Sequence, residues 1–283
     1  AAKNLNQASE WLQRAADGGD VESMRLLGVL FEGGSGYSAD WKKSVRWYTA
    51  AAKHGDADSN FHLGLLLEAG KGTSRNLSEA AECYRKAAVA GNSDSMKCFA
   101  LCCEQGLGVV LDMKQAREWY EKAAALGNVA AMTALGYHFE KGSFGERDFG
   151  VALKWYKKAA EIGDARAMTN LGLCYEQGLG GGKNLASAVE WYRKASATGL
   201  PQASTCLGVC YAKGLGLPQD QAEAVKLFST AAKGGDPRAM LYLASRHEDG
   251  RGVTMDRAQA LTWYRKAAAL GNAEARARLE KMK

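Results

Sequence analysis

The sequence has little proline and histidine, and it has no long apolar segment. Its 283 residues include three prolines and four histidines. No run approaches the roughly 18 consecutive apolar residues of a membrane-spanning helix, so we expect no segment to cross a bilayer. The H-E-x-x-H pattern of zinc enzymes and the G-x-S-x-G pattern of serine hydrolases do not occur. Composition therefore excludes a spanning segment and does not indicate either enzyme class.

Charge of one sign is also scarce. Lys and Arg total 37, Asp and Glu total 31, and the formal net charge is +6. The two signs are interspersed, so no nucleic-acid binding is expected. Nucleotide binding is not predicted either. The glycine-rich segment 178–183 has Gln177 where a P-loop needs glycine, Asn184 where it needs Ser or Thr, and it follows a predicted helix rather than a strand.

The chain does contain a strict internal repeat. The pattern "EWYEKAAALGN" of residues 118–128 returns, with changes, at 154–164, 190–200 and 262–272. The period is 36 residues without an insertion. An alanine column recurs at this period from Ala15 to Ala267, and a glycine column from Gly19 to Gly271. A fixed period of this length is typical of solenoid proteins.

Each repeat is predicted to contain two helices. The first begins after an Asn or Asp, which are preferred N-cap residues: Asn4, Asp40, Asn76, Asp112, Asp148, Asn184, Asp220 and Asp256. It ends at the invariant glycine, which tolerates the left-handed conformation. A second Asn or Asp usually caps the next helix at once, although Leu200 replaces this cap in one repeat.

The second helix is predicted to pack through small and apolar residues. In the fourth repeat Met132, Leu135, Gly136 and Phe139 lie on one helical face. This helix ends at a G-x-G loop, whose first glycine forms a third column from Gly34 to Gly250. No strand alternation occurs, so we expect one all-α domain over 1–283, with repeat units at about 4–39, 40–75, 76–111, 112–147, 148–183, 184–219, 220–255 and 256–283.

These motifs resemble the Sel1-like repeat family, which is related to tetratricopeptide arrays. The shared pattern is A-x-x-W-Y-x-K-A-A-x-x-G-N followed by A-M-x-x-L-G-x-x-Y-x-x-G-x-G, seen with single changes at 116–142 and 152–180. A tetratricopeptide array would instead show a 34-residue period with a regular proline. The resemblance implies a right-handed α/α superhelix. Local irregularity is expected at Cys83 and Leu227, which replace tryptophan, and at "KGSFGERD" in the fourth repeat.

The cysteine pattern bears on the compartment. The resemblance implies a disulfide between columns eight residues apart in secreted members, but here these columns hold pairs such as Ala124 and Met132. Cys98/Cys102 and Cys206/Cys210 are i,i+4 pairs, whose spacing does not suit a disulfide. We therefore expect a reducing, cytoplasmic location. The chain begins inside a repeat with no charged-then-apolar signal, which is consistent with an excised domain.

A column of possible metal ligands runs along the second helices: Cys102, His138, Cys174 and Cys210. Zinc needs ligands about 2.0–2.3 Å from one ion. Successive stacked helices place such positions about 10 Å apart. We therefore predict that these residues are packing residues, and we expect no metal and no cofactor.

The exposed face of the first helices carries the candidate binding residues. The resemblance implies that these helices line the concave side, where two partly basic columns would suit an acidic peptide. The candidates are Arg85, Lys86, Lys122, Lys157, Lys158, Arg193, Lys194, Arg265 and Lys266. The competing interpretation is a merely solvated face with i,i+4 ion pairs: Glu10–Arg14, Glu82–Lys86, Glu118–Lys122 and Glu190–Lys194.

Three functional hypotheses follow. The resemblance favours a non-catalytic scaffold or adaptor that binds a partner protein in the concave groove. An alternative is a secreted, enzyme-like member that binds cell-wall material or β-lactams, which the missing cysteine columns disfavour. A third is self-association through an exposed repeat end.

Overall fold

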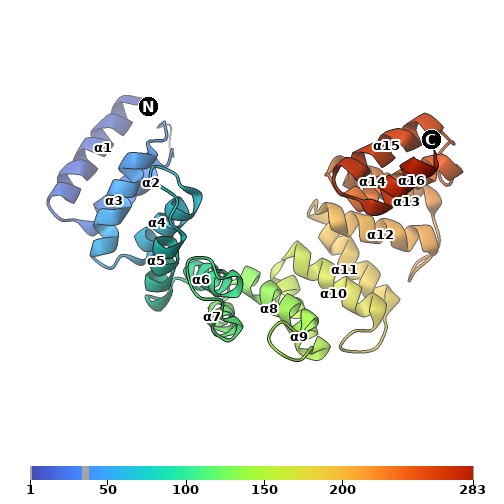
Figure 1. Ribbon diagram of the computed structural model, residues 1–283, viewed down its shortest axis with the longest axis horizontal. Helices are drawn as coiled ribbons and strands as arrows, with labels where there is room; N and C mark the ends of the chain where they lie inside the picture. Colours follow the sequence, from blue (N-terminus) through green and yellow to red (C-terminus); the bar gives the residue numbers. More distant parts are fainter. Residues whose placement is uncertain (1, 34–37, 283) are drawn as a thin grey trace. The chain divides into compact units, whose positions relative to one another are not determined.

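The computed structural model describes residues 2–33 and 38–282, with side chains from residue 7 onward. Over these residues it contains sixteen α-helices and no strand, so the all-α prediction is confirmed (Figure 1). The helices are α1 (Ala2–Asp17), α2 (Val21–Phe31), α3 (Trp41–Lys53), α4 (Ala57–Ala69), α5 (Leu77–Val89), α6 (Ser93–Gln105), α7 (Met113–Ala125), α8 (Val129–Lys141), α9 (Phe149–Ile162), α10 (Ala165–Gln177), α11 (Leu185–Ala197), α12 (Pro201–Lys213), α13 (Gln221–Lys233), α14 (Pro237–Asp249), α15 (Arg257–Ala269) and α16 (Ala273–Lys281).

The odd-numbered helices are the first helices of the repeats, and the even-numbered helices are the second helices. Packing divides the chain into two compact units, Ala1–Leu135 and Gly136–Lys283. We call them the N-terminal unit and the C-terminal unit and describe each by itself. Within each unit, neighbouring helices in the sequence pack against each other, as α1, α2 and α3 do in Figure 1. The single domain over 1–283 stays a prediction.

The helix starts follow the predicted caps, with one exception. Asp112 accepts a hydrogen bond from the backbone N–H of Gln115 at 2.9 Å, and the other first helices from α3 onward are capped in the same way. The prediction for Asn4 is wrong, because α1 begins at Ala2 and includes Asn4. Leu200 makes no side-chain cap bond, and Pro201 occupies the first turn that follows.

The helix ends depend on glycines in the left-handed region. Gly127 follows α7 with φ +84°, and Gly178 caps α10 with φ +76°. The second glycine of the G-x-G loop also permits a close approach. A Cβ on Gly180 would lie 2.2 Å from the carbonyl oxygen of Phe149, at the start of the first helix of its own repeat. Gly34, from the first repeat, lies outside the described residues.

The core consists of small residues facing a buried aromatic column. Ala123 and its equivalents from Ala51 to Ala267 are fully buried. A Cβ on Gly136 would lie 2.5 Å from the ring of Tyr156, so this glycine lets α8 approach α9 closely. Met132, Leu135 and Phe139 are buried on the predicted face of α8.

At five repeat boundaries, a hydrogen bond from the buried tyrosine ties a first helix to the second helix before it. Tyr192 donates to Glu176 at 2.7 Å, and the same bond joins Tyr84 to Glu68, Tyr120 to Glu104, Tyr156 to Glu140 and Tyr264 to Glu248. Of the two other equivalent pairs, the first keeps Tyr48 and Glu32, and in the second Phe228 replaces the tyrosine and Ala212 replaces the glutamate. The donor and the acceptor are thus lost together.

The irregular loop of the fourth repeat is a local change, as predicted. Phe144 occupies the position of the second loop glycine and packs on His138 and Phe139, with ring centroids 4.8 and 5.6 Å apart. Gly145, one residue later, takes the positive φ of +124°. The helices on either side of this loop, α8 and α9, lie at the same repeat positions as the other second and first helices.

Candidate interaction face on the first helices

All nine candidate binding residues lie exposed on first helices. Arg85 and Lys86 are on α5 and Lys122 is on α7, in the N-terminal unit. The other six are on α9, α11 and α15 in the C-terminal unit: Lys157, Lys158, Arg193, Lys194, Arg265 and Lys266. Each of these five first helices therefore presents one or two of the cations, and the set recurs along the sequence and is not one cluster.

The lysines of this surface stack on tryptophan rings of their own helices. Lys122 lies 4.1 Å from the ring centroid of Trp119, and the same arrangement joins Lys158 to Trp155 at 4.7 Å, Lys194 to Trp191 at 4.3 Å, Lys266 to Trp263 at 4.4 Å and Arg14 to Trp11 at 5.0 Å. Each such contact is worth about 0.5–1 kcal/mol at an exposed site. We call the set formed by these five cations and Lys86 the basic column. Lys86 has no ring beneath it because Cys83 replaces the tryptophan.

The expected i,i+4 ion pairs do not form. None of the four predicted partners of Arg14, Lys86, Lys122 and Lys194 comes within ion-pair distance among the described residues. Glu82 instead accepts from Arg85, three residues on, at 2.7 Å. The four ion pairs that the competing interpretation names are therefore absent among the described residues, and binding at the basic column stays a prediction.

Three of the candidate cations outside the basic column contact other side chains of the chain. Arg85 is held by Glu82, Lys157 lies 4.0 Å from Glu161, and Arg193 donates to the hydroxyl of Tyr211 at 3.1 Å. Sequence reasoning did not distinguish the two columns. The W-Y-x-K spacing places a lysine three residues after the ring, which permits the stacking but does not by itself select it.

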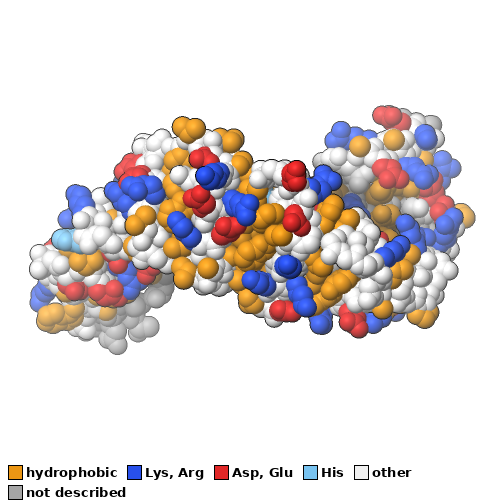
Figure 2. Space-filling model, turned by 90° about the horizontal axis from the view of Figure 1, so that it is seen from below, with side chains coloured by type: hydrophobic (Ala, Val, Ile, Leu, Met, Phe, Trp, Pro, Cys, Tyr) orange, Lys and Arg blue, Asp and Glu red, His pale blue; other side chains and the backbone are white. Residues whose placement is uncertain are grey.

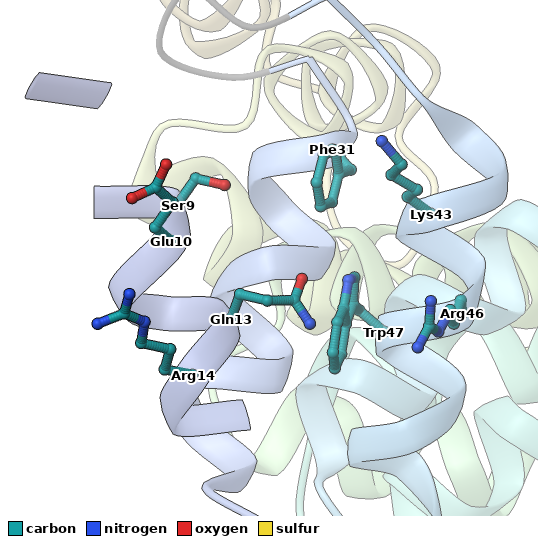
Figure 3. Close-up of a pocket in the computed structure, with 8 residues that line it drawn as sticks. All are labelled: Ser9, Glu10, Gln13, Arg14, Phe31, Lys43, Arg46 and Trp47. Carbon is teal, nitrogen blue, oxygen red and sulfur yellow. The ribbon is translucent and has the colours of Figure 1, made fainter. Parts of the chain in front are cut away.

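Three shallow depressions accompany these cations. The first lies between α1, α2 and α3 and has a volume of about 420 Å³ (Figure 3). The second, also about 420 Å³, is lined by α3, α4 and α5. The third is lined along α9 by Trp155, three lysines, Val151 and Glu161. In Figure 2, Lys and Arg side chains on one face are scattered among exposed apolar side chains, with acids between them.

The side chains of the cysteine column are buried, and burial raises the pKa values of its thiols. All seven cysteines are free and buried, as expected for packing residues. Burial raises the pKa of Cys174 to about 11 and that of Cys210 to about 12, so both thiols stay protonated near neutral pH. His138 is buried against Phe144. In the part of the chain that the structure describes, no three potential ligands come together around a metal position.

The fold and these columns define a tetratricopeptide-like helical repeat protein. A model of the Sel1 repeat matches residues 1–20, 21–56, 57–92, 98–128, 129–164, 165–199, 203–236 and 237–272. The chain therefore belongs to the Sel1 repeat family, whose members typically act as protein-interaction scaffolds. Most matched segments run from a second helix into the next first helix, which is the pair that the Tyr–Glu bond joins.

Solved structures support this assignment. A protective antigen of uropathogenic Escherichia coli strains, with an SLR fold, is 30% identical, with a TM-score of 0.84 over 94% of this chain. This chain spans 57% of that antigen. A Sel1 repeat protein from Oxalobacter formigenes is 29% identical, with a TM-score of 0.80 over 100% of this chain and 82% of its own. No curated protein matches. Among the described helices, none is long and apolar enough to cross a bilayer.

Proposed function

We propose that the chain is a non-catalytic interaction module whose first helices bind an acidic segment of another protein. The observation that carries this proposal is the basic column, in which five of the six cations lie over tryptophan rings and not against carboxylates. A stacked lysine keeps its ammonium group exposed to solvent and charged. A partner carboxylate can therefore pair with it without first displacing an acid of the chain.

The tryptophans add an apolar component to the same surface. Trp119, Trp155, Trp191 and Trp263 are each half-buried, so part of each ring stays in contact with solvent. Aromatic residues and arginine are enriched at the centres of protein interfaces, where they contribute most of the binding energy. A partner with acidic residues next to apolar ones would use both features of the column.

A charge-reversal experiment tests this proposal. The immobilised wild-type chain is compared with a variant in which Arg85, Lys86, Arg193 and Lys194 are all changed to Glu. A control variant reverses four exposed cations on second helices instead, at Arg166, Lys213, Arg278 and Lys281. Proteins captured at physiological salt are quantified by mass spectrometry. A partner retained by the control and lost by the first variant supports the proposal, and a partner retained by both contradicts it.

Self-association is a second candidate, favoured by the surface of α1. Trp11 is 67% exposed, whereas its equivalent Trp47 is 5% exposed, and Ala15 is exposed where every other member of the alanine column is buried. The change Trp11→Glu should then reduce the mass that sedimentation measures at high concentration. A wild-type chain that is monomeric at all concentrations would contradict self-association.

A further inference from the structure

Two of the three depressions lie on either side of the same helix, α3, in the N-terminal unit. The depression toward α1 is lined by Lys43, Arg46 and Trp47 of α3, Phe31 of α2, and a set on α1 that comprises Ser9, Glu10, Gln13 and Arg14. In Figure 3, Gln13 and Trp47 face each other across this depression, and Lys43 lies beside Phe31. Its floor is thus largely aromatic, and its rim is cationic.

The depression toward α5 has the same character. Lys53 and Ala52 of α3 form one side, and Arg85, Lys86 and Val89 of α5 form the other, with Gly55 and Asn60 between them. Val89 is 68% exposed, which leaves an apolar side chain beside three cations. No acid lines this depression among the described residues.

The charge of the two depressions is strongly one-sided, unlike that of the whole chain. Among the described residues that line them, six are cations and one, Glu10, is an acid. Four of the cations make no ion pair within the described part of the chain: Arg14, Arg46, Lys53 and Lys86. Lys43 lies 3.4 Å from the exposed carboxylate of Asp40, and Arg85 is paired with Glu82.

We propose that these two depressions and the surface of α3 between them bind one extended acidic segment of a partner protein. This inference rests on the proposed function and assigns recognition of the segment to α1–α5. Cations that have no acidic partner within the chain attract and orient a negatively charged segment. Phe31 and Val89 then provide apolar contacts for a non-polar residue within that segment, and the largely buried Trp47 lines the first depression.

The spacing of the cations sets the length of the segment. Lys43 and Lys53 are ten residues apart on α3, which corresponds to about 15 Å along the helix. An extended chain advances about 3.3 Å per residue, so about five residues cover this distance and about seven reach both depressions. The preferred segment therefore has about seven residues, with acids at most positions and an apolar residue near the centre.

The test uses the whole chain and two fluorescein-labelled peptides, EEEFEEE and KKKFKKK. Binding is measured by fluorescence anisotropy at physiological salt. In addition, the indole N–H signal of Trp47, assigned with the variant Trp47→Phe, is followed by NMR. We expect EEEFEEE to bind, to shift the Trp47 signal and to bind more weakly as salt is raised, because salt screens exposed charges. KKKFKKK should not bind.

Three variants with equal changes in charge locate the site. The groove variant carries Arg14→Glu, Arg46→Glu and Lys53→Glu, and the column variant carries Lys158→Glu, Lys194→Glu and Lys266→Glu. The control variant carries Arg166→Glu, Lys213→Glu and Lys281→Glu on second helices. We expect the groove variant to lose about tenfold or more in affinity, because like charges at an interface repel. The column variant should lose less affinity than the groove variant, and the control variant should change it about twofold or less.

Each contrary result has a distinct meaning. An equal or larger loss in the column variant, or a peptide that does not shift Trp47, overturns the assignment to α1–α5 and retains the proposed function. Failure of wild-type chain to bind EEEFEEE, or equal binding of KKKFKKK, overturns both. If circular dichroism shows that the groove variant is misfolded, the glutamine variant Arg14→Gln, Arg46→Gln, Lys53→Gln replaces it, and unchanged affinity in that variant overturns the inference.

Discussion

At the scale of the residue, the Tyr–Glu hydrogen bond shows how one pair of side chains fixes the packing of two helices. The tyrosine is buried beside a glycine, so its hydroxyl reaches the neighbouring helix and needs a partner there. Burial and the bond to Glu176 both raise the pKa of Tyr192. At the one boundary where phenylalanine replaces the tyrosine, Ala212 stands in place of the glutamate acceptor. The chain thus contains its own example of a boundary without the bond.

The pair Tyr192–Glu176 can be tested with a double-mutant cycle. The change Tyr192→Phe should lower the free energy of unfolding by about 1–2 kcal/mol, because a hydrogen bond to a carboxylate is lost. After Glu176→Ala, the same change should cost less, so the two effects should differ from additivity by about 0.5 kcal/mol or more. Urea unfolding monitored by circular dichroism measures each term. Strictly additive effects would contradict the assigned bond.

Because its thiols are buried, we expect the protein to lose stability at alkaline pH. Burial raises the pKa of Cys206 to about 11 from its ordinary value of 9.0. A group whose pKa is higher in the folded state contributes stability below its unfolded pKa and loses it as pH rises through the folded value. The free energy of unfolding should therefore fall between about pH 9 and about pH 11, with the buried tyrosines acting in the same direction.

Two measurements check this expectation. Urea midpoints recorded below and above pH 9 should decrease as pH rises. At a pH near 8, iodoacetamide should label none of the seven cysteines of the native chain and all seven in denaturant, because burial both covers and protonates the thiols. Rapid labelling of native Cys174 would show that this part of the core is open.

At the scale of the element, most of the local structure could be predicted from the sequence. Caps, glycine ends and the alanine column follow from backbone chemistry that every repeat shares. The stacking of the lysines could not, because Lys122 has Trp119 three residues before it and Glu118 four residues before it, and both spacings suit a contact. A half-buried ring is fixed in place, whereas the exposed Glu118 is not. The depressions beside α3 were missed because side chains from separate helices form them.

Alanine substitutions at two glycines distinguish the stability cost of backbone strain from the stability cost of close packing. Gly216 has φ +71°, and a Cβ on it would lie 2.4 Å from the carbonyl oxygen of Leu185. Gly199 has φ +88° with open space where a Cβ would be. Alanine at Gly199 should cost about 1–2 kcal/mol for the left-handed conformation alone. Alanine at Gly216 should cost about 1–3 kcal/mol more, because the loop must move away from α11.

Thermal unfolding of the two alanine variants and the wild-type chain measures this difference. The melting temperature should fall further for Gly216→Ala than for Gly199→Ala. Equal melting temperatures would mean that the G-x-G loop does not need its close approach to the start of the first helix.

At the scale of the whole molecule, the strongest helix contacts among the described residues of each unit join helices that are close in the sequence. In each unit a helix packs on its neighbours along the chain, and second helices of successive repeats touch, as α10 and α12 do. In such an array, stability is approximately a sum of repeat and nearest-neighbour terms. Damage to one repeat should then spread only a short distance, which a globule with one shared core would not allow.

Hydrogen exchange can measure how far such damage spreads. The change Tyr192→Ala removes a fully buried ring from the packing of α10 and α11, so amide protection should fall in the neighbouring helices of the C-terminal unit and remain in α3–α6. The matched change Tyr84→Ala, in the N-terminal unit, should give the reverse pattern, with protection lost around α4 and α5 and retained in α11–α14. Uniform loss of protection after either change would show that the whole chain unfolds as one cooperative body, and nearest-neighbour stability would then be wrong for this protein.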